Sequence, residues 1–148
     1  MRYRKLGNTD LEVTDISLGT WVFGGECWGE TEDALSERVV SEAIEQGINI
    51  IDTAPIYGSG RSETVVGKAL KNQRKKVIIA TKCGLKAENG RLKNDLTPAF
   101  IKQEIDNSLK RLSTDYIDLY QCHWPDDKTP YDETFGALEN LKKQGKIL

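Results

Sequence analysis

Four short apolar segments alternate along the chain with four longer segments of helical spacing, and this alternation constrains the fold more than any other feature. The predicted strands cover residues 16–19, 48–52, 77–82 and 116–122. The predicted helices cover residues 31–47, 62–70, 97–112 and 129–145. Strict alternation of strand and helix favours parallel strands joined by helical crossovers. The sequence therefore predicts an α/β fold of (βα)4 type that occupies residues 1–148 as one unit.

Capping residues mark the beginnings of three of these helices. Thr97-Pro98 and Thr129-Pro130 each combine a capping hydroxyl with a proline at the first helical position. Ser62 is the expected N-cap of the second helix.

Two segments outside the alternation have the signals of β-hairpins. Residues 2–5 and 11–13 flank a polar turn, which predicts an N-terminal β-hairpin. Asn89-Gly90 lies in the long segment 84–96, and this dipeptide is typical of a hairpin turn. We therefore expect a second, smaller hairpin after the third strand.

The chain length limits how much of a barrel these strands can form. A complete (β/α)8 barrel needs about 250 residues, and the chain has 148. Residues 146–148 lie where a fifth strand would begin. We therefore expect half of a parallel (β/α)8 TIM barrel, with a small open sheet as the alternative.

Composition argues against several classes of partner. The net charge of −2 disfavours a surface for nucleic acid, and the longest apolar segments fall well short of a membrane helix. The basic residues 2–5 are followed by no apolar segment, so we expect no signal peptide. The three cysteines are odd in number and lack paired metal-ligand spacing, which fits a reducing cytoplasm. We expect a cytoplasmic protein that acts on a small molecule.

Polar side chains end three consecutive predicted strands. Asp52 ends the second strand, Lys82 the third and His123 follows the fourth, while Tyr57 lies five residues after Asp52. Taken singly, Asp52 could cap a turn and His123 could be a core residue. Because the carboxyl ends of parallel strands meet at one edge of a sheet, we expect all four side chains to converge there.

These four side chains together suit proton transfer to a carbonyl compound. A phenol is a weak acid at neutral pH, and a lysine ammonium within hydrogen-bonding reach stabilises the phenolate. Asp52 would keep Lys82 charged and oriented, and His123 would position a carbonyl oxygen beside Tyr57. We therefore interpret Tyr57 as a general acid that protonates an alkoxide as a hydride arrives.

Several motifs in this order and spacing resemble the N-terminal half of the aldo-keto reductase family. The matching motifs are Leu18-Gly19-Thr20-Trp21, Gly47-Ile48-Asn49-Ile50-Ile51-Asp52-Thr53-Ala54, Ile56-Tyr57-Gly58, Arg61-Ser62-Glu63, Ala80-Thr81-Lys82, Ser108-Leu109-Lys110-Arg111-Leu112, Tyr116-Ile117-Asp118-Leu119 and His123-Trp124-Pro125. The resemblance covers essentially the whole chain.

The resemblance implies a function and a set of residues. Family members reduce aldehydes and ketones with NADPH, and their catalytic tetrad corresponds to Asp52, Tyr57, Lys82 and His123. The cofactor-binding positions implied for this chain are Thr20, Trp21 and Asp52. The substrate-binding positions are Trp21, Tyr57, His123 and Trp124.

The cofactor's phosphate groups have no evident binding motif in this sequence. The chain contains no G-x-G-x-x-G and no P-loop. In the family, as in many barrels, phosphate contacts come from loops after the later strands. We therefore expect the 148-residue chain alone to have negligible NADPH-dependent turnover.

Three alternatives remain open at this stage. Potassium-channel β-subunits are similar in this region and act as regulatory modules, although they typically have asparagine where this chain has His123. Lys82 could instead be the Schiff-base nucleophile of a barrel aldolase. A zinc site of Cys27, Cys122 and His123 is disfavoured because no ligand pair has short spacing, so we expect no metal.

A half-barrel would also need a partner. It leaves its first and fourth strands as sheet edges, which favours a homo-oligomer or a second half-barrel that completes the sheet.

A few residues are assigned on pattern alone. Alternation turns Cys83 and Cys122 toward the helix layer, which predicts buried structural thiols. Residues 74–76 are expected to be a solvated helix end. No role follows from the sequence for Asp118, which interrupts the fourth strand.

Overall fold

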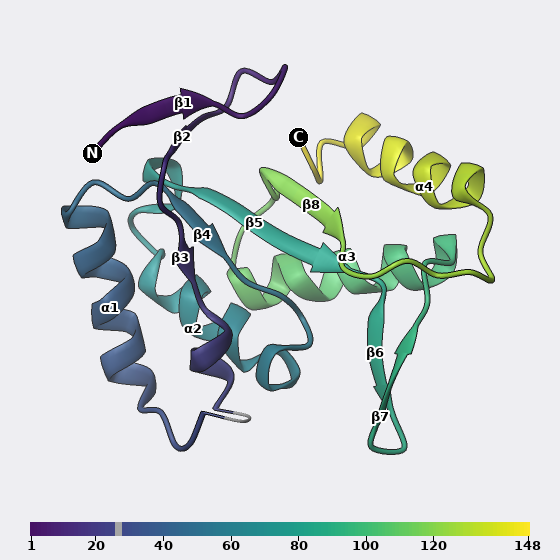
Figure 1. The fold of residues 1–148 in the computed structure, drawn as a ribbon, viewed down its shortest axis with the longest axis horizontal. Coiled ribbons are helices and arrows are strands. Elements are labelled where there is room, and N and C mark those ends of the chain that lie inside the picture. The colour runs from purple at the N-terminus through teal and green to yellow at the C-terminus, as the bar shows by residue number, and fades with distance from the viewer. Residues whose placement is uncertain (26–27) are drawn as a thin grey trace.

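A four-stranded parallel sheet forms the centre of the molecule (Figure 1). The computed structural model describes residues 1–25 and 28–148. The strands lie in the order β3 (Leu18–Gly19), β4 (Ile50–Asp52), β5 (Ile78–Cys83) and β8 (Leu119–Cys122). Each strand therefore pairs with the next one along the chain, which is the strand order of a barrel rather than of a doubly wound sheet.

Helices connect the strands and pack against one another in sequence order. They are α1 (Asp33–Glu45), α2 (Arg61–Ala69), α3 (Pro98–Leu112) and α4 (Tyr131–Lys143). Each contacts the next along the chain, and α1, α2 and α3 lie along one face of the sheet (Figure 1). The core fills the space between, where Ile51 and Ile79 of the sheet meet Val65, Ile101 and Ile105 of the helices. None of the helices in the described residues has the length and hydropathy needed to cross a bilayer.

Both predicted hairpins are present. β1 (Tyr3–Lys5) pairs with β2 (Glu12–Thr14), and the side-chain oxygen of Asn49 ties this hairpin to the start of β4 by accepting from the Thr14 amide at 2.8 Å. β6 (Leu85–Glu88) pairs with β7 (Arg91–Asn94). Asn89 and Gly90 form the second turn with φ of 52° and 73°, the conformation that this dipeptide favours.

Residue Ile147 begins a further parallel pairing beyond the four strands. It forms an isolated parallel bridge with Ile117, just before β8. This is the position at which the sequence predicts the start of a fifth strand.

Only one of the three predicted helix caps is present. The Thr97 hydroxyl accepts a hydrogen bond from the Phe100 amide, with Pro98 at the first helical position. α2 begins at Arg61 after Gly60, so the prediction that Ser62 caps it is wrong; the Ser62 hydroxyl is fully buried and bonds Thr20 and Thr53.

The hydroxyl before α4 has another partner. Thr129 donates to the Asp126 carboxylate instead of capping the helix. A carboxylate three residues earlier therefore takes the hydroxyl that was predicted to cap the helix.

Arg74 and Asp118 form a nearly buried ion pair that the sequence did not reveal. Nη2 of Arg74 lies 2.6 Å from Oδ2 of Asp118, which also accepts from the Ile79 amide at 2.9 Å. The guanidinium stacks 4.2 Å from the centre of the Tyr116 ring. The expectation that Arg74 is a solvated helix end is therefore wrong, and Asp118 is explained as the anchor that joins this arginine to β5.

Candidate active site

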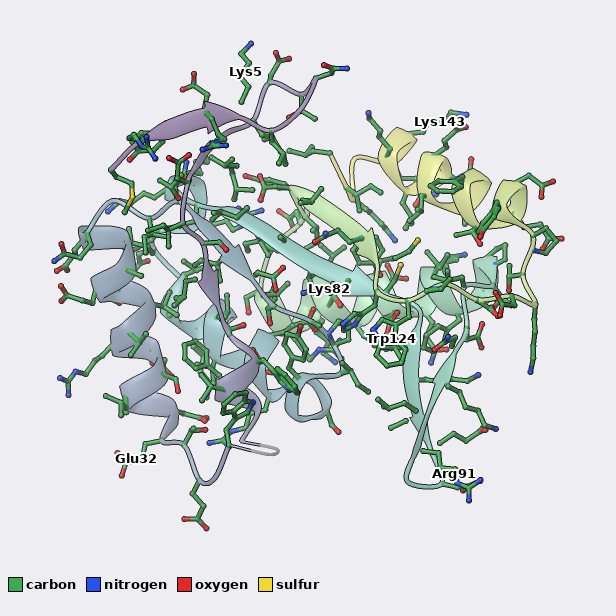
Figure 2. All side chains as sticks on the ribbon, viewed as in Figure 1. Lys5, Glu32, Lys82, Arg91, Trp124 and Lys143 are labelled. Atoms are coloured by element: carbon green, nitrogen blue, oxygen red, sulfur yellow. The ribbon has the colours of Figure 1, made fainter. Side chains whose placement is uncertain are left out.

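The side chains of Asp52, Lys82 and His123 converge at the carboxyl ends of three neighbouring strands. Asp52 ends β4, Lys82 is the penultimate residue of β5, and His123 directly follows β8. Ile51 and Ile79 point into the helix-covered core, so alternation places Asp52 and Lys82 on the opposite face. Lys82 lies near the centre of the molecule in Figure 2.

Lys82 is held by three oxygen atoms. Its Nζ lies 2.7 Å from Oδ1 of Asp52, 2.9 Å from the carbonyl oxygen of Thr53 and 3.3 Å from the hydroxyl of Tyr57. An ammonium group has three N–H donors, and three acceptors surround it here. The side chain is only 13% exposed, which strengthens its electrostatic interactions relative to water.

Aromatic rings pack against the Tyr57 ring. Trp21 stacks on the Tyr57 ring with centroids 6.0 Å apart and an interplanar angle of 28°. His123 meets the same ring edge-on at 6.0 Å, and Trp28 meets Trp21 edge-on at 5.5 Å. Trp28 thus supports Trp21, a role that the sequence left open.

Burial lowers the pKa of His123 and so favours its neutral form. Desolvation lowers the pKa of His123 below its usual value, and the nearby charge of Lys82 lowers it further, whereas Asp52 opposes the shift. A neutral imidazole can donate one hydrogen bond to a carbonyl oxygen without carrying a positive charge.

A cluster of buried hydroxyl groups forms hydrogen bonds at the end of β4. The Thr20 hydroxyl donates to the Asp52 carbonyl oxygen at 2.9 Å and lies 2.8 Å from the Ser62 hydroxyl. Ser62 in turn lies 3.0 Å from the Thr53 hydroxyl, and all three side chains are fully buried. Thr20 therefore fixes the end of β4, and its contact with a cofactor stays a prediction.

A cavity of about 560 Å³ opens above Tyr57 and His123. Its walls are largely apolar and include Trp21, Ile56, Leu92 and Trp124. Trp21 and Trp124 are about half exposed, as expected for residues at the mouth of a pocket. The β6–β7 hairpin closes one side, a contribution that the sequence did not reveal because hairpin signals say nothing about where a hairpin docks.

The two described cysteines lie opposite each other on neighbouring strands, toward the helix-covered core. Cys83 of β5 is opposite Cys122 of β8, and both are free thiols. Cys83 is buried in the core as predicted, whereas Cys122 is only partly buried and packs against the core. The alternative zinc site includes Cys27, which lies outside the described residues; within residues 1–25 and 28–148 no cluster of three metal-ligating side chains occurs.

Sequence comparison identifies relatives of this chain. The profile of the aldo/keto reductase family matches residues 15–148. The aldo-keto reductase YhdN of Bacillus subtilis (strain 168) is 48% identical over 149 residues, which cover 99% of this chain and 45% of YhdN. The NADH-specific methylglyoxal reductase of Escherichia coli (strain K12) is 40% identical over 163 residues, 99% of this chain and 50% of the relative. The chain thus spans about half the length of the curated relatives it matches.

Solved structures agree with this placement. Aldo-keto reductase AKR11C1 from Bacillus halodurans (holo form) superposes with a TM-score of 0.90 at 42% identity, covering 99% of this chain and 48% of that one. The glycerol dehydrogenase AKR11B4 from Gluconobacter oxydans gives 0.87 at 43% identity, with coverage of 98% and 46%. The parallel sheet, the residues at its carboxyl edge and the profile match all lead to one conclusion: this chain belongs to the aldo/keto reductase family.

Proposed function

We propose that this chain carries the proton-transfer half of a nicotinamide-dependent carbonyl reductase, with an aldehyde or ketone as substrate. The observation that carries the proposal is the position of Lys82 Nζ between Asp52 and Tyr57. Because the ammonium donates to the phenol oxygen, the phenol hydrogen is free to point into the cavity. The same ammonium then stabilises the phenolate that remains after the proton has left.

Each residue of the site has a distinct task in this proposal. The substrate oxygen lies between the Tyr57 hydroxyl and the imidazole of His123, which together orient it. Tyr57 donates its proton to that oxygen as negative charge develops there. The apolar walls of the cavity exclude water, which strengthens both hydrogen bonds.

The cavity suits the nicotinamide end of a cofactor. The aromatic face of Trp21 and a volume of about 560 Å³ fit a flat ring together with a small carbonyl compound. When bound, the cofactor supplies the hydride. Trp21 and Asp52 would border its ring.

We propose NADPH as this cofactor, following the family resemblance, although one relative is named for NADH. The test therefore compares both nucleotides.

We also propose that residues 1–148 form the N-terminal half of a barrel. The strand order β3-β4-β5-β8 and the bridge between Ile117 and Ile147 support this arrangement. Further strands, from the same chain or a second half-barrel, would then pair next to β8. The 148 residues alone would have negligible turnover, because the family places the phosphate contacts after later strands.

The Schiff-base alternative receives less support from the geometry. A nucleophilic lysine needs a free lone pair, whereas all three donors of the Lys82 ammonium have acceptors here. The regulatory alternative receives less support from the contact between His123 and Tyr57, since a binding module needs neither a proton donor nor a group that orients a carbonyl.

Replacing Tyr57 tests the proposed reductase. In the protein with its complete barrel, Tyr57→Phe should lower kcat for aldehyde reduction by about 10²- to 10⁴-fold, the usual contribution of a general acid. Oxidation of NADPH or NADH is followed by absorbance, and Tyr131→Phe on the exposed start of α4 is the matched control. Activity of Tyr57→Phe within threefold of the parent would refute the assignment.

A further inference from the structure

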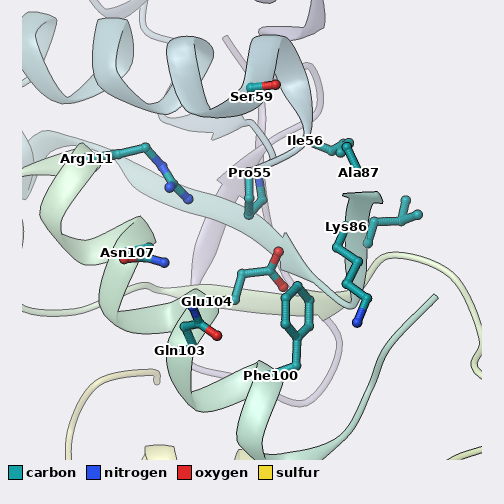
Figure 3. Close-up of a pocket in the computed structure, with 11 residues that line it drawn as sticks. Pro55, Ile56, Ser59, Lys86, Ala87, Phe100, Gln103, Glu104, Asn107 and Arg111 are labelled. Carbon is teal, nitrogen blue, oxygen red and sulfur yellow. The ribbon is translucent and has the colours of Figure 1, made fainter. Parts of the chain in front are cut away.

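A second cavity of about 280 Å³ lies between the loop after β4 and helix α3 (Figure 3). Pro55 and Ile56 of that loop form one wall, and Phe100, Glu104 and Arg111 of α3 form another. None of Asp52, Tyr57, Lys82 and His123 lines it. The cavity therefore adjoins the candidate active site, with which it shares Ile56, Ser59, Leu85 and Ala87, but it contains none of the four candidate catalytic side chains.

Glu104 is the buried polar group of this cavity. Its side chain projects from α3 toward Pro55 and Phe100 in Figure 3, and the residue is only 6% exposed. One carboxylate oxygen accepts from the Gly84 amide at 2.7 Å. The other oxygen accepts no hydrogen bond within the part of the chain that the structure describes, and it is not sealed from solvent. A donor group on a ligand that enters the cavity can therefore reach this oxygen.

The other charges around the cavity are already paired. Arg111 donates to Oε2 of Glu63 at 2.6 Å, and Lys86 lies 2.6 Å from Oδ2 of Asp95. Glu104 therefore carries the one charge in the described lining that has no ionic partner. A cation is the ligand that would balance it.

The walls of the cavity define what kind of cation fits. Phe100, Pro55, Ile56 and Leu85 present carbon atoms that can cover an alkyl chain. The amide groups of Gln103 and Asn107 lie at the rim, where they add hydrogen-bonding capacity. An aliphatic chain that ends in a small donor group matches these walls better than a hydrated metal ion, which needs several oxygen ligands.

We propose that this cavity binds a small primary alkylammonium ion, with its ammonium group on the free oxygen of Glu104 and its alkyl chain against Phe100 and Pro55. The proposal does not depend on the reductase function.

Burial and the nearby Glu63 raise the pKa of Glu104 to about 7, with Asp95 acting in the same direction and Arg111 and the Gly84 amide against it. The bound ammonium adds an opposite charge and stabilises the ionised form. Binding should therefore be strong at pH 8 and weak at pH 5.5.

The Gly84 amide is a direct reporter of this site, because it bonds the Glu104 carboxylate. The experiment titrates ¹⁵N-labelled protein with n-butylammonium chloride at pH 8 and follows the Gly84 resonance by NMR. We expect a saturable shift with the ammonium ion and none with n-butanol, which has the same shape without the charge. Sodium chloride at equal ionic strength is the blank. At pH 5.5 the Kd should rise at least tenfold.

Glu104→Gln separates ligand binding from a purely structural role. The glutamine keeps an oxygen for the Gly84 amide, yet it should raise the Kd at least tenfold because the charge is gone. Glu139→Gln, on the exposed face of α4, should leave the Kd within twofold. An equal shift with n-butanol, an unchanged Kd in Glu104→Gln, or a Kd independent of pH would each overturn the proposal. The first and third readouts need only the unmodified protein.

Discussion

Gly24 and Gly58 touch through their backbones where the loops after β3 and β4 cross. A Cβ atom at Gly24 would lie 2.6 Å from the Gly58 nitrogen and 2.8 Å from the Tyr57 carbonyl carbon. Gly58 has a φ of 58°, in the left-handed region that favours glycine. This approach brings the turn Trp21–Gly24 against the turn Tyr57–Gly60, and so stacks Trp21 on Tyr57.

Gly24→Ala should therefore damage the site without touching a catalytic group. The added methyl must push the backbone that carries Tyr57, and shifts of about 1 Å at a reacting group can cost about 10²-fold in rate. We expect kcat/KM for carbonyl reduction to fall at least tenfold. Gly136→Ala on α4 is the control, since a Cβ there meets nothing within 4 Å and should leave the rate unchanged. Full activity of Gly24→Ala would show that the loop contact does not position Tyr57.

The pKa of His123 can be measured directly, because the chain has a single histidine. Desolvation and Lys82 lower it, so the NMR titration midpoint of the imidazole should lie below about 6.5. Lys82→Met should raise the midpoint by removing one of these causes.

The lowered pKa of His123 also makes the free energy of unfolding depend on pH. The unfolded chain takes up the proton first as the pH falls, so the free energy of unfolding should decrease below about pH 6.5. His123→Gln should abolish this part of the pH dependence, whereas a midpoint at or above 6.5 would contradict the assignment.

The sequence predicted the elements whose signals are local. The four strands, both hairpins and the Thr97-Pro98 cap follow from apolar periodicity, turn dipeptides and capping chemistry within a few residues. The convergence of Asp52 and Lys82 also followed, because alternation along a strand and parallel pairing fix which face a side chain occupies.

Two of the errors concern side chains whose partners lie far away in the sequence. Ser62 has the chemistry of a cap, yet the buried Thr20 hydroxyl, 42 residues earlier, offers a competing partner. Arg74 belongs to a basic run that normally faces solvent, and its acceptor Asp118 lies 44 residues later. No local pattern predicts either pairing, because both depend on how helices dock on the sheet.

The Arg74–Asp118 pair should be important for stability. Removing one partner of a buried ion pair leaves the other charge uncompensated, which typically costs about 3–5 kcal/mol. Asp118→Ala also removes the acceptor of the Ile79 amide. We expect the free energy of unfolding, measured in urea, to fall by about that amount.

Asp106→Ala provides the surface comparison. It breaks the more exposed contact with Lys146 and should cost less than about 1 kcal/mol. Equal effects of the two substitutions would contradict the distinction between buried and exposed pairs in this fold.

Glu104 should lower the stability of the protein at alkaline pH. The pKa of Glu104 is about 7 in the folded chain, against an ordinary value of 4.5. The folded state therefore holds the carboxyl proton more tightly than the unfolded state does. As a result, the free energy of unfolding decreases as the pH rises between these two pKa values. This difference between the two pKa values corresponds to about 3 kcal/mol in the free energy of unfolding. Glu104→Gln should therefore raise the free energy of unfolding by about 1–3 kcal/mol at pH 8 and leave it nearly unchanged at pH 5, as urea denaturation at both pH values would show. A variant that is less stable than the parent at pH 8 would mean that the ionised carboxylate is already balanced, which would remove the electrostatic reason for a cation in the second cavity.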